Sequence, residues 1–212
     1  MDLAGIVLYC ARAARFAATV GALYAAVRIL GACRRGQKPD AKRLGLELLA
    51  LCWLAALAEI IALRGLVPQG RQLQPVPLGT VGPLAAAAWA ALCRRAAAGA
   101  LHPAAVGRIL WPLVYNVAGN LLWFVPLGML GPLLCSPCPP ARWPDLRRPG
   151  RCLAAGAAVS ALLELLQYLL ATGATDLDDV WLNALGALLG WLVWKLGSAL
   201  CRRSRGKTPA AV

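Results

Sequence analysis

The chain has 212 residues, of which 60% are hydrophobic and only 15% are charged, and its mean hydropathy is +0.64. Soluble domains are nearer half apolar and a quarter charged, so this composition excludes an ordinary soluble domain and indicates an integral membrane protein. The formal net charge of +13 does not indicate nucleic acid as a partner. The basic residues lie in short loops and in the C-terminal tail, without a zinc-finger or basic-helix pattern.

The first apolar segment, residues 3–33, is the least uniform because Arg12, Arg15 and Arg28 interrupt it. Its best membrane-spanning part is 16–33, with Arg28 reaching toward the interface. Arg12 and Arg15 follow the first apolar run instead of preceding it, so we expect no cleaved signal peptide.

Four longer apolar segments follow. About 20 apolar residues cross the hydrocarbon core of a bilayer as a helix. Residues 109–134 contain no Asp, Glu, Lys, Arg or His, and Glu164 is the only formal charge in 153–175. The predicted spans after the first are 44–63, 109–134, 151–171 and 180–200.

One further apolar segment, 81–93, is too short for a span and predicts a re-entrant or interfacial helix. We therefore predict an all-α integral membrane protein with about five transmembrane helices plus one short re-entrant or interfacial helix. Its expected parts are an N-terminal transmembrane helix with a basic cytoplasmic loop (1–43), one membrane domain (44–200) and a basic cytoplasmic tail (201–212).

The distribution of Lys and Arg predicts the orientation. Residues 33–43 carry five of them, 138–151 carry four and 201–207 carry four, whereas the turn 172–179 carries none. Because basic loops stay in the cytoplasm, we expect the N-terminus outside, the C-terminus inside and the acidic turn outside. The lipid bilayer is then the first partner of this multi-pass protein.

Polar side chains recur at helical spacing in the last three spans. The orientation above places all of them in one layer of the membrane, at its outer side. A lone carboxylate at the centre of a membrane helix costs roughly 2.5 to 3.5 kcal/mol, so Glu164 is the strongest indication of a functional site. The other members of this polar layer are Asn116, Asn120, Gln167, Asp176, Asp178, Asp179 and Asn183, and Ser160 lies on the same helical face as Glu164.

We predict Glu164, Asp176 and Asp179 as the candidate catalytic carboxylates. The predicted binding or orienting residues are Asn116, Asn120, Gln167, Asn183 and Asp178. The alternative is structural. The amides and Glu164 would join the helices, and an aspartate, Asp178 or Asp179, would cap the last helix.

Two glycines four residues apart, Gly186 and Gly190, form a small-xxx-small motif in the last span. Such motifs predict close packing against another helix, and a homo-oligomer through the same face is a further expectation.

We expect no metal and no cofactor. Cys135 and Cys138 have the CxxC spacing, but only Cys152 is near them, and a zinc site needs four ligands. His102 is the only histidine, and no Ser-His-Asp arrangement, P-loop or GxGxxG motif is present.

Three segments resemble VanZ-like proteins. Residues 115–134, YNVAGNLLWFVPLGMLGPLL, are similar to the N-x3-FxPLG segment of that family. Residues 160–193 are similar to its S-x3-E-x2-Q helix and its D-x2-D-V-x2-N-x2-G-x3-G helix, and 73–80 resembles, more weakly, an outer Pro- and Thr-containing segment.

The resemblance covers roughly residues 44–197. It implies a bacterial plasma-membrane protein of a family named for a member of a glycopeptide-resistance cluster that lowers sensitivity to teicoplanin. One position departs from the pattern. The family commonly has an arginine in a G-R-S-x-D sequence, whereas TGATD (172–176) has none, so the arginine for an Arg–carboxylate pair is missing here.

The leading interpretation is a VanZ-like protein with an outward-facing polar pocket between the last three spans, acting in cell-envelope homeostasis or teicoplanin resistance. A lipid-linked envelope precursor or a glycopeptide would be its partner. The alternatives are an enzyme that uses carboxylate acid–base chemistry on such precursors, and a small-solute carrier. The carrier interpretation depends on the intramembrane carboxylates and on the prolines and glycines at 126–132, which predict a broken third span.

Overall fold

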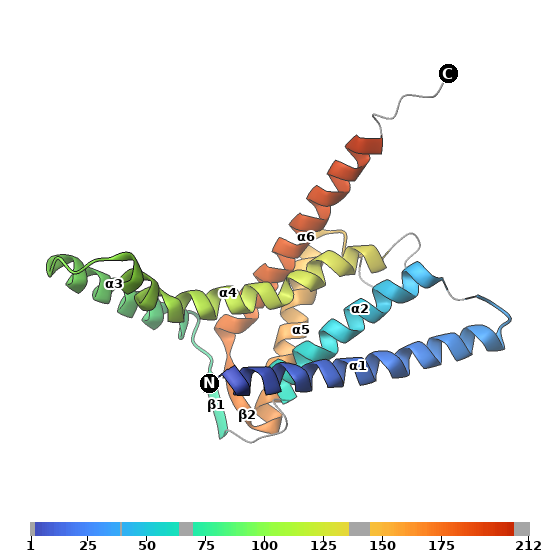
Figure 1. Ribbon diagram of the computed structural model, residues 1–212, viewed down its shortest axis with the longest axis horizontal. Coiled ribbons are helices and arrows are strands. Elements are labelled where there is room, and N and C mark those ends of the chain that lie inside the picture. Colours follow the sequence, from blue (N-terminus) through green and yellow to red (C-terminus); the bar gives the residue numbers. More distant parts are fainter. Residues whose placement is uncertain (1–2, 39, 64–69, 136–144, 206–212) are drawn as a thin grey trace.

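The computed structural model describes residues 3–38, 40–63, 70–135 and 145–205. Helices make up most of the described chain (Figure 1). In chain order the elements are α1 (Leu3–Arg34), α2 (Ala41–Ala58), a π-helical turn η1 (Glu59–Leu63), β1 (Gly70–Gln74), α3 (Val81–Ala97), α4 (Pro103–Leu134), α5 (Pro149–Leu170), β2 (Thr172–Asp176) and α6 (Leu177–Arg205).

Five helical segments of the described chain are long and apolar enough to cross a membrane, which confirms the predicted all-α membrane fold. They are Cys10–Arg34, Ala41–Leu63, Pro103–Leu134, Pro149–Leu170 and Leu177–Arg202. The short helix α3 has 17 residues, or about 26 Å at 1.5 Å per residue, which is less than a hydrocarbon core of roughly 30 Å. It projects to one side together with the beginning of α4 (Figure 1).

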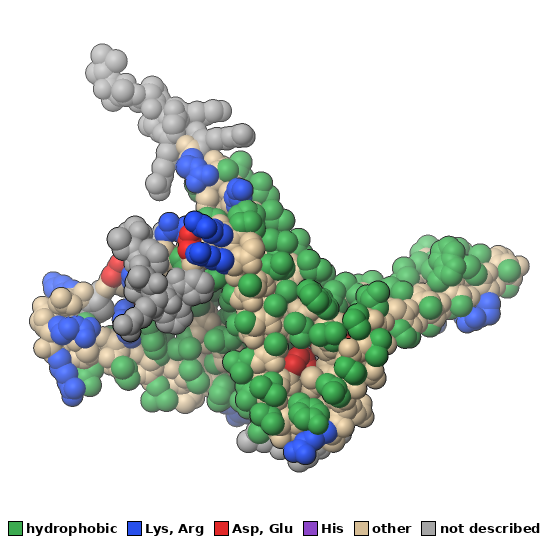
Figure 2. Space-filling model, turned by 180° about the vertical axis from the view of Figure 1, so that it is seen from behind, with side chains coloured by type: hydrophobic (Ala, Val, Ile, Leu, Met, Phe, Trp, Pro, Cys, Tyr) green, Lys and Arg blue, Asp and Glu red, His purple; other side chains and the backbone are tan. Residues whose placement is uncertain are grey.

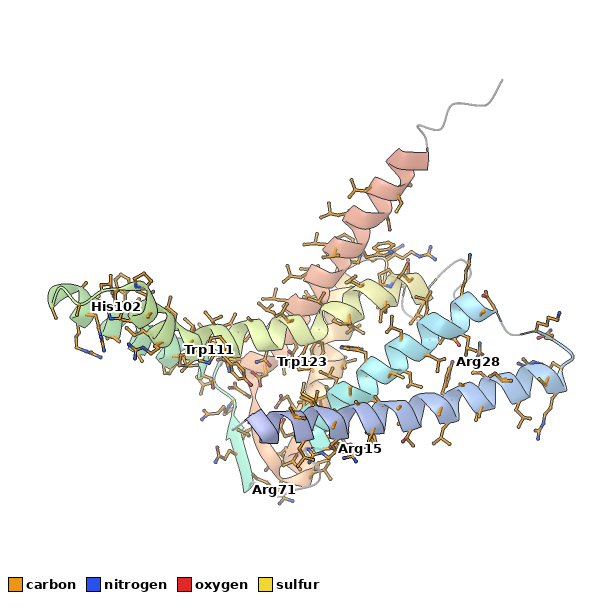
Figure 3. The ribbon with its side chains drawn as sticks, in the orientation of Figure 1. Arg15, Arg28, Arg71, His102, Trp111 and Trp123 are labelled. Atoms are coloured by element: carbon orange, nitrogen blue, oxygen red, sulfur yellow. The ribbon has the colours of Figure 1, made fainter. Side chains whose placement is uncertain are left out.

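The helices α1 and α2 form a hairpin in which Glu47 and, in η1, Glu59 pair with arginines. Arg12 donates to Glu59 at 2.5 Å, and Arg28 lies 3.1 Å from Glu47 (Figure 3). Tyr24 and Arg43 also donate to Glu47, at 2.8 and 3.1 Å. Pairing lowers the cost of charge in an apolar segment, which explains how the first span tolerates Arg12 and Arg28.

The helix α4 is continuous from Pro103 to Leu134, although Pro112, Pro126 and Pro132 lie inside it. The predicted interruption at 126–132 is therefore wrong. This stretch packs closely on α6 instead, because a Cβ on Gly128 would lie 1.9 Å from the carbonyl oxygen of Ala187. A neighbouring helix at that distance holds the proline-containing segment in helical form.

The pair α4 and α6 forms the largest helix–helix interface of the described chain. A Cβ on Gly186 would lie 2.1 Å from the carbonyl oxygen of Leu121, and one on Gly190 would lie 2.0 Å from that of Val125. The small-xxx-small motif thus packs against α4, as predicted. Since α4 of the same chain already covers both glycines, the expected homo-oligomer through them has no free surface here.

A buried aromatic residue joins three helices in the core. Phe124 of α4 is fully buried and belongs to one core cluster with Leu57 of α2 and Leu163 of α5. Trp53 meets the Phe124 ring edge-on, with the ring centroids 6.2 Å apart, and its Nε1 donates to the carbonyl of Trp123 at 3.0 Å. This geometry satisfies the indole N–H inside the apolar packing.

The structure contains a small parallel sheet of two strands, which was not predicted from the sequence. β1 pairs with β2 in the register Gly70 with Thr172 through Gln74 with Asp176. The pairing brings the end of β1, and the loop that follows it, beside the acidic turn at the start of α6 (Figure 1).

We expect Gly186→Ala and Gly190→Ala each to lower the free energy of unfolding by roughly 1 to 3 kcal/mol, because the added methyl group forces α4 and α6 apart. Unfolding of the purified protein in detergent micelles measures this. Gly119→Ala is the matched control, since no atom lies within 4 Å of the Cβ position there. Equal stability of the Gly186→Ala and Gly119→Ala variants would contradict the packing role.

Candidate functional site

Asp176 ends β2 and precedes α6, and its side chain is almost completely buried. One carboxylate oxygen accepts from the backbone N–H of Asp178 at 2.9 Å, and the other accepts from the hydroxyl of Thr80. The first contact satisfies a free N–H at the helix start, so Asp176 caps α6. The prediction that Asp178 or Asp179 caps this helix is therefore wrong, since Asp176 is the capping residue.

Asp178 holds the start of α3. Its carboxylate accepts from three backbone N–H groups, those of Leu78 at 2.6 Å and of Thr80 and Val81 at 3.0 Å each. These groups include donors at the N-terminal end of α3, where a negative charge is favoured by the helix dipole. Leu78 has a φ of 59°, a left-handed conformation that non-glycine residues adopt rarely. The three hydrogen bonds offset this strain.

Glu164 and Gln167 connect α5 to β2. The carboxylate of Glu164 accepts from the backbone N–H of Asp176 at 3.0 Å, and the amide of Gln167 donates to the carbonyl of Ala174 at 3.0 Å. The hydroxyl of Thr175 donates to the carbonyl of Glu164 at 3.2 Å. Glu164 and Gln167 are 4% and 2% exposed, so both polar side chains bind the strand from inside the helix packing.

The remaining predicted residues are Asn116 and Asn120 of α4 and Asp179 and Asn183 of α6. Asn120 of α4 donates to Asp179, and Asn183 donates to the hydroxyl of Ser160 at 2.8 Å. Among the described residues, the side-chain oxygens of Asn116 and Asn183 are buried without a hydrogen-bond partner. The contacts of Asn120 and Asn183 fit the structural interpretation, in which polar side chains join membrane helices.

A groove of about 450 Å³ runs along α5 and the start of α6. Of the predicted site residues, Glu164 and Asp176 line it together, and the other predicted residues do not. Its remaining walls are mainly apolar, with Leu73, Pro75, Ala161, Leu165, Tyr168, Leu177 and Val180 beside the polar Gln74 and Thr175. Figure 2 shows acidic atoms framed by hydrophobic side chains near the place where α5, β2 and α6 meet.

Several residues of this site were not predicted from the sequence. Thr80 and the backbone of 78–81 bind the two aspartates, and Thr172 donates to the carbonyl of Ala62 in η1 at 2.5 Å. The weak resemblance of 73–80 was the only signal for the first of these. No signal indicated Thr172.

No group of three or more His, Cys, Asp or Glu side chains within the described ranges could hold a metal ion. Cys138 of the CxxC pair lies outside the described residues.

A family model described as VanZ/LLP1 matches residues 48–198. The chain belongs to the VanZ/LLP1 family. Searches of curated proteins and of solved structures each gave no significant match.

In this VanZ/LLP1 protein β1 places an arginine beside β2, the TGATD segment (172–176) that lacks the arginine of the G-R-S-x-D pattern. Arg71 of β1 pairs in register with Gly173 (Figure 3). Its guanidinium donates to the carbonyl of Tyr168 at 3.3 Å and lies 5.9 Å from the centroid of that ring. Arg71 therefore binds the C-terminal end of α5 and places positive charge at the edge of the sheet.

We expect Asp178→Asn to release the turn before α3, because the neutral amide replaces a charged acceptor of three N–H groups. Hydrogen bonds to charged groups contribute roughly 1.5 to 3 kcal/mol, so amide exchange at residues 78–81 should accelerate about tenfold or more. Hydrogen exchange with mass spectrometry measures this. Asp145→Asn, a partly exposed aspartate elsewhere, should leave exchange at 78–81 unchanged, and an equal effect of both variants would contradict the role of Asp178.

Proposed function

We propose that this VanZ/LLP1 protein acts at the outer face of the plasma membrane, in cell-envelope homeostasis or glycopeptide (teicoplanin) resistance, by binding an amphipathic envelope molecule. The observation that carries the proposal is the groove in which two buried carboxylates, Glu164 and Asp176, lie within mainly apolar walls. Such a pocket suits a ligand with an apolar body and a few polar groups.

The chemistry of the groove supports a ligand that donates hydrogen bonds. Carboxylates accept from hydroxyl, amide or ammonium groups, and these interactions are strongest where water is excluded. Leu165 and Tyr168 line the groove and are 52% and 37% exposed on α5, a helix apolar enough to span the membrane. A lipid-linked envelope precursor or a lipophilic glycopeptide would place its chain against them.

The charge distribution along α6 supports the outer location. Asp178 and Asp179 lie in the first turn of this helix, and Arg202 lies near its other end. Arg202 lies 23 residues after Asp179, a distance of about 35 Å along the helix, which is enough to cross a hydrocarbon core. Since basic ends stay in the cytoplasm, the carboxylate end belongs outside.

We expect this protein to raise the teicoplanin concentration that inhibits a sensitive bacterial host, and the double variant Glu164→Gln/Asp176→Asn to lose that effect. The amides keep the side-chain volumes but remove the charged acceptors. The measurement is the minimal inhibitory concentration at matched amounts of membrane-inserted protein. Glu47→Gln, in the α1–α2 hairpin, is the control and should keep the resistance. A resistant double variant with normal expression would rule out the groove as the working site.

Catalysis is the second candidate, favoured by the two carboxylates in one groove, since acid–base chemistry on a lipid-linked precursor needs groups of this kind. The purified protein in liposomes separates the interpretations. Binding alone predicts retention of the precursor unchanged, catalysis predicts its conversion, and transport predicts uptake of solute. The continuous α4 counts against a carrier built on a broken helix.

A further inference from the structure

A basic pocket lies near the other end of α6, and none of its lining residues belongs to the carboxylate groove. It has a volume of about 330 Å³ and forms between the turn that precedes α5 and the C-terminal half of α6. Four cations and two tryptophans line it: Arg147, Arg148, Lys195, Arg202, Trp191 and Trp194. Neither the family match nor the proposed function assigns a role to these residues.

The tryptophans order the pocket. Trp191 is 6% exposed, and its Nε1 donates to the carbonyl of Arg147 at 2.8 Å, which fixes the turn against α6. The Nζ of Lys195 lies 4.7 Å from the centroid of the Trp191 ring, a cation–π distance. Trp194 lies beside Trp191, with the ring centroids 6.5 Å apart. Lys195 is thus held at the pocket by an aromatic ring.

The polar residues that line the pocket come from two elements. Lys195, Ser198 and Arg202 follow one another on α6 at spacings of three and four, which places them on one face. Arg147 and Arg148 come from the turn before α5, where Arg148 lies 3.9 Å from Asp145. The guanidinium of Arg147 donates to the carbonyl of Cys135. Basic side chains gather near this part of α6 in Figure 2.

The position of the pocket matches a membrane interface. Arg202, which lines the pocket, is 23 residues from Asp179 along α6, or about 35 Å. This distance exceeds a hydrocarbon core of roughly 30 Å, so the Arg202 end of the pocket and the acidic turn lie near opposite sides of the core. Tryptophan and basic residues concentrate at such interfaces. α6 also exposes the apolar Leu192, Leu196 and Leu200 next to this pocket, where acyl chains would contact them.

We propose that this pocket binds the phosphate of an anionic phospholipid headgroup. Cations attract the phosphate, the Ser198 hydroxyl donates to it, and Trp194, which is less buried than Trp191, flanks the glycerol region. Basic pockets between membrane helices are known to take such headgroups. This inference is independent of the proposed function, because none of the residues in it lines the carboxylate groove.

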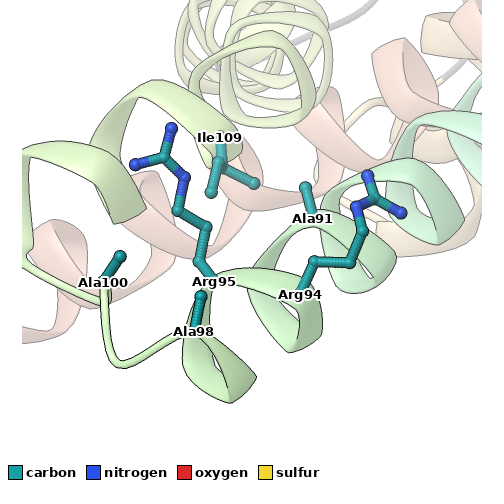
Figure 4. A pocket seen from close by; sticks show the side chains of 6 residues that line it. All are labelled: Ala91, Arg94, Arg95, Ala98, Ala100 and Ile109. Atoms are coloured by element: carbon teal, nitrogen blue, oxygen red, sulfur yellow. The ribbon is translucent and has the colours of Figure 1, made fainter.

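The chain offers a matched control in a third pocket, at the turn between α3 and α4. Arg94 and Arg95 line it with alanines and Ile109, and the two arginine side chains extend in different directions from α3 (Figure 4). It has the same kind of charge but neither an aromatic ring nor a hydroxyl group among its lining residues.

The test is native mass spectrometry of the purified full chain with phosphatidylglycerol or phosphatidylcholine in mixed micelles. We expect the wild-type protein to retain phosphatidylglycerol preferentially. Lys195→Gln/Arg202→Gln should weaken that binding by roughly thirtyfold, since each basic residue near the headgroups contributes about fivefold. Arg94→Gln/Arg95→Gln, with the same loss of charge, should retain wild-type binding, and Lys195→Arg should keep most of it.

Equal retention of the two lipids by the wild-type protein would overturn the proposal. An equal loss in the Arg94→Gln/Arg95→Gln control would also overturn it, because the effect would then be one of overall charge. A third arm adds millimolar inorganic phosphate. Displacement of the lipid at that concentration would identify free phosphate as the ligand and overturn the phospholipid assignment.

Discussion

A chain of carboxylates joins three parts of this protein that are distant in sequence. Glu164 in α5 binds the backbone of Asp176, Asp176 binds the backbone of Asp178 and the hydroxyl of Thr80, and Asp178 binds the turn that begins α3. An N–H group without a partner is costly in apolar surroundings. The position of α3, the pairing of β1 with β2 and the start of α6 all depend on these contacts.

This arrangement explains why three aspartates gather in the turn 176–179. Asp176 caps α6, Asp178 holds the start of α3, and Asp179 binds Asn120 of α4. Each carboxylate therefore has a structural contact, and Asp178 in particular is occupied by three donors. The groove is lined by only two of the polar layer's carboxylates, Glu164 and Asp176, because the others turn toward α3 and α4.

Hydropathy predicted the five spans, because the length and the apolar composition of a segment are local properties. The loop charges, and not a helical repeat, predicted that Asp176 lies in the same layer as Glu164. The sheet was not predictable in the same way. Its strands, GRQLQ and TGATD, are five residues long and lack the alternation of an amphipathic strand. Thr80 and Asp176, which are hydrogen-bonded, are separated by 96 residues in the sequence, so no local pattern includes both. The predicted break at Pro126 was wrong for a related reason. The packing of α6 on Gly128, a contact between distant parts of the chain, keeps this part of α4 helical.

The helix α6 connects the two polar regions of the molecule. Its acidic first turn complements the positive end of the helix dipole, and the cations near its other end complement the negative one. The same charge order agrees with the positive-inside rule, so the dipole of the helix and its insertion favour one arrangement. The close packing of Gly186 and Gly190 on α4 lies between these ends. If α6 crosses the membrane in the proposed orientation, its charged residues lie toward its two ends and the close-packed glycines lie between them.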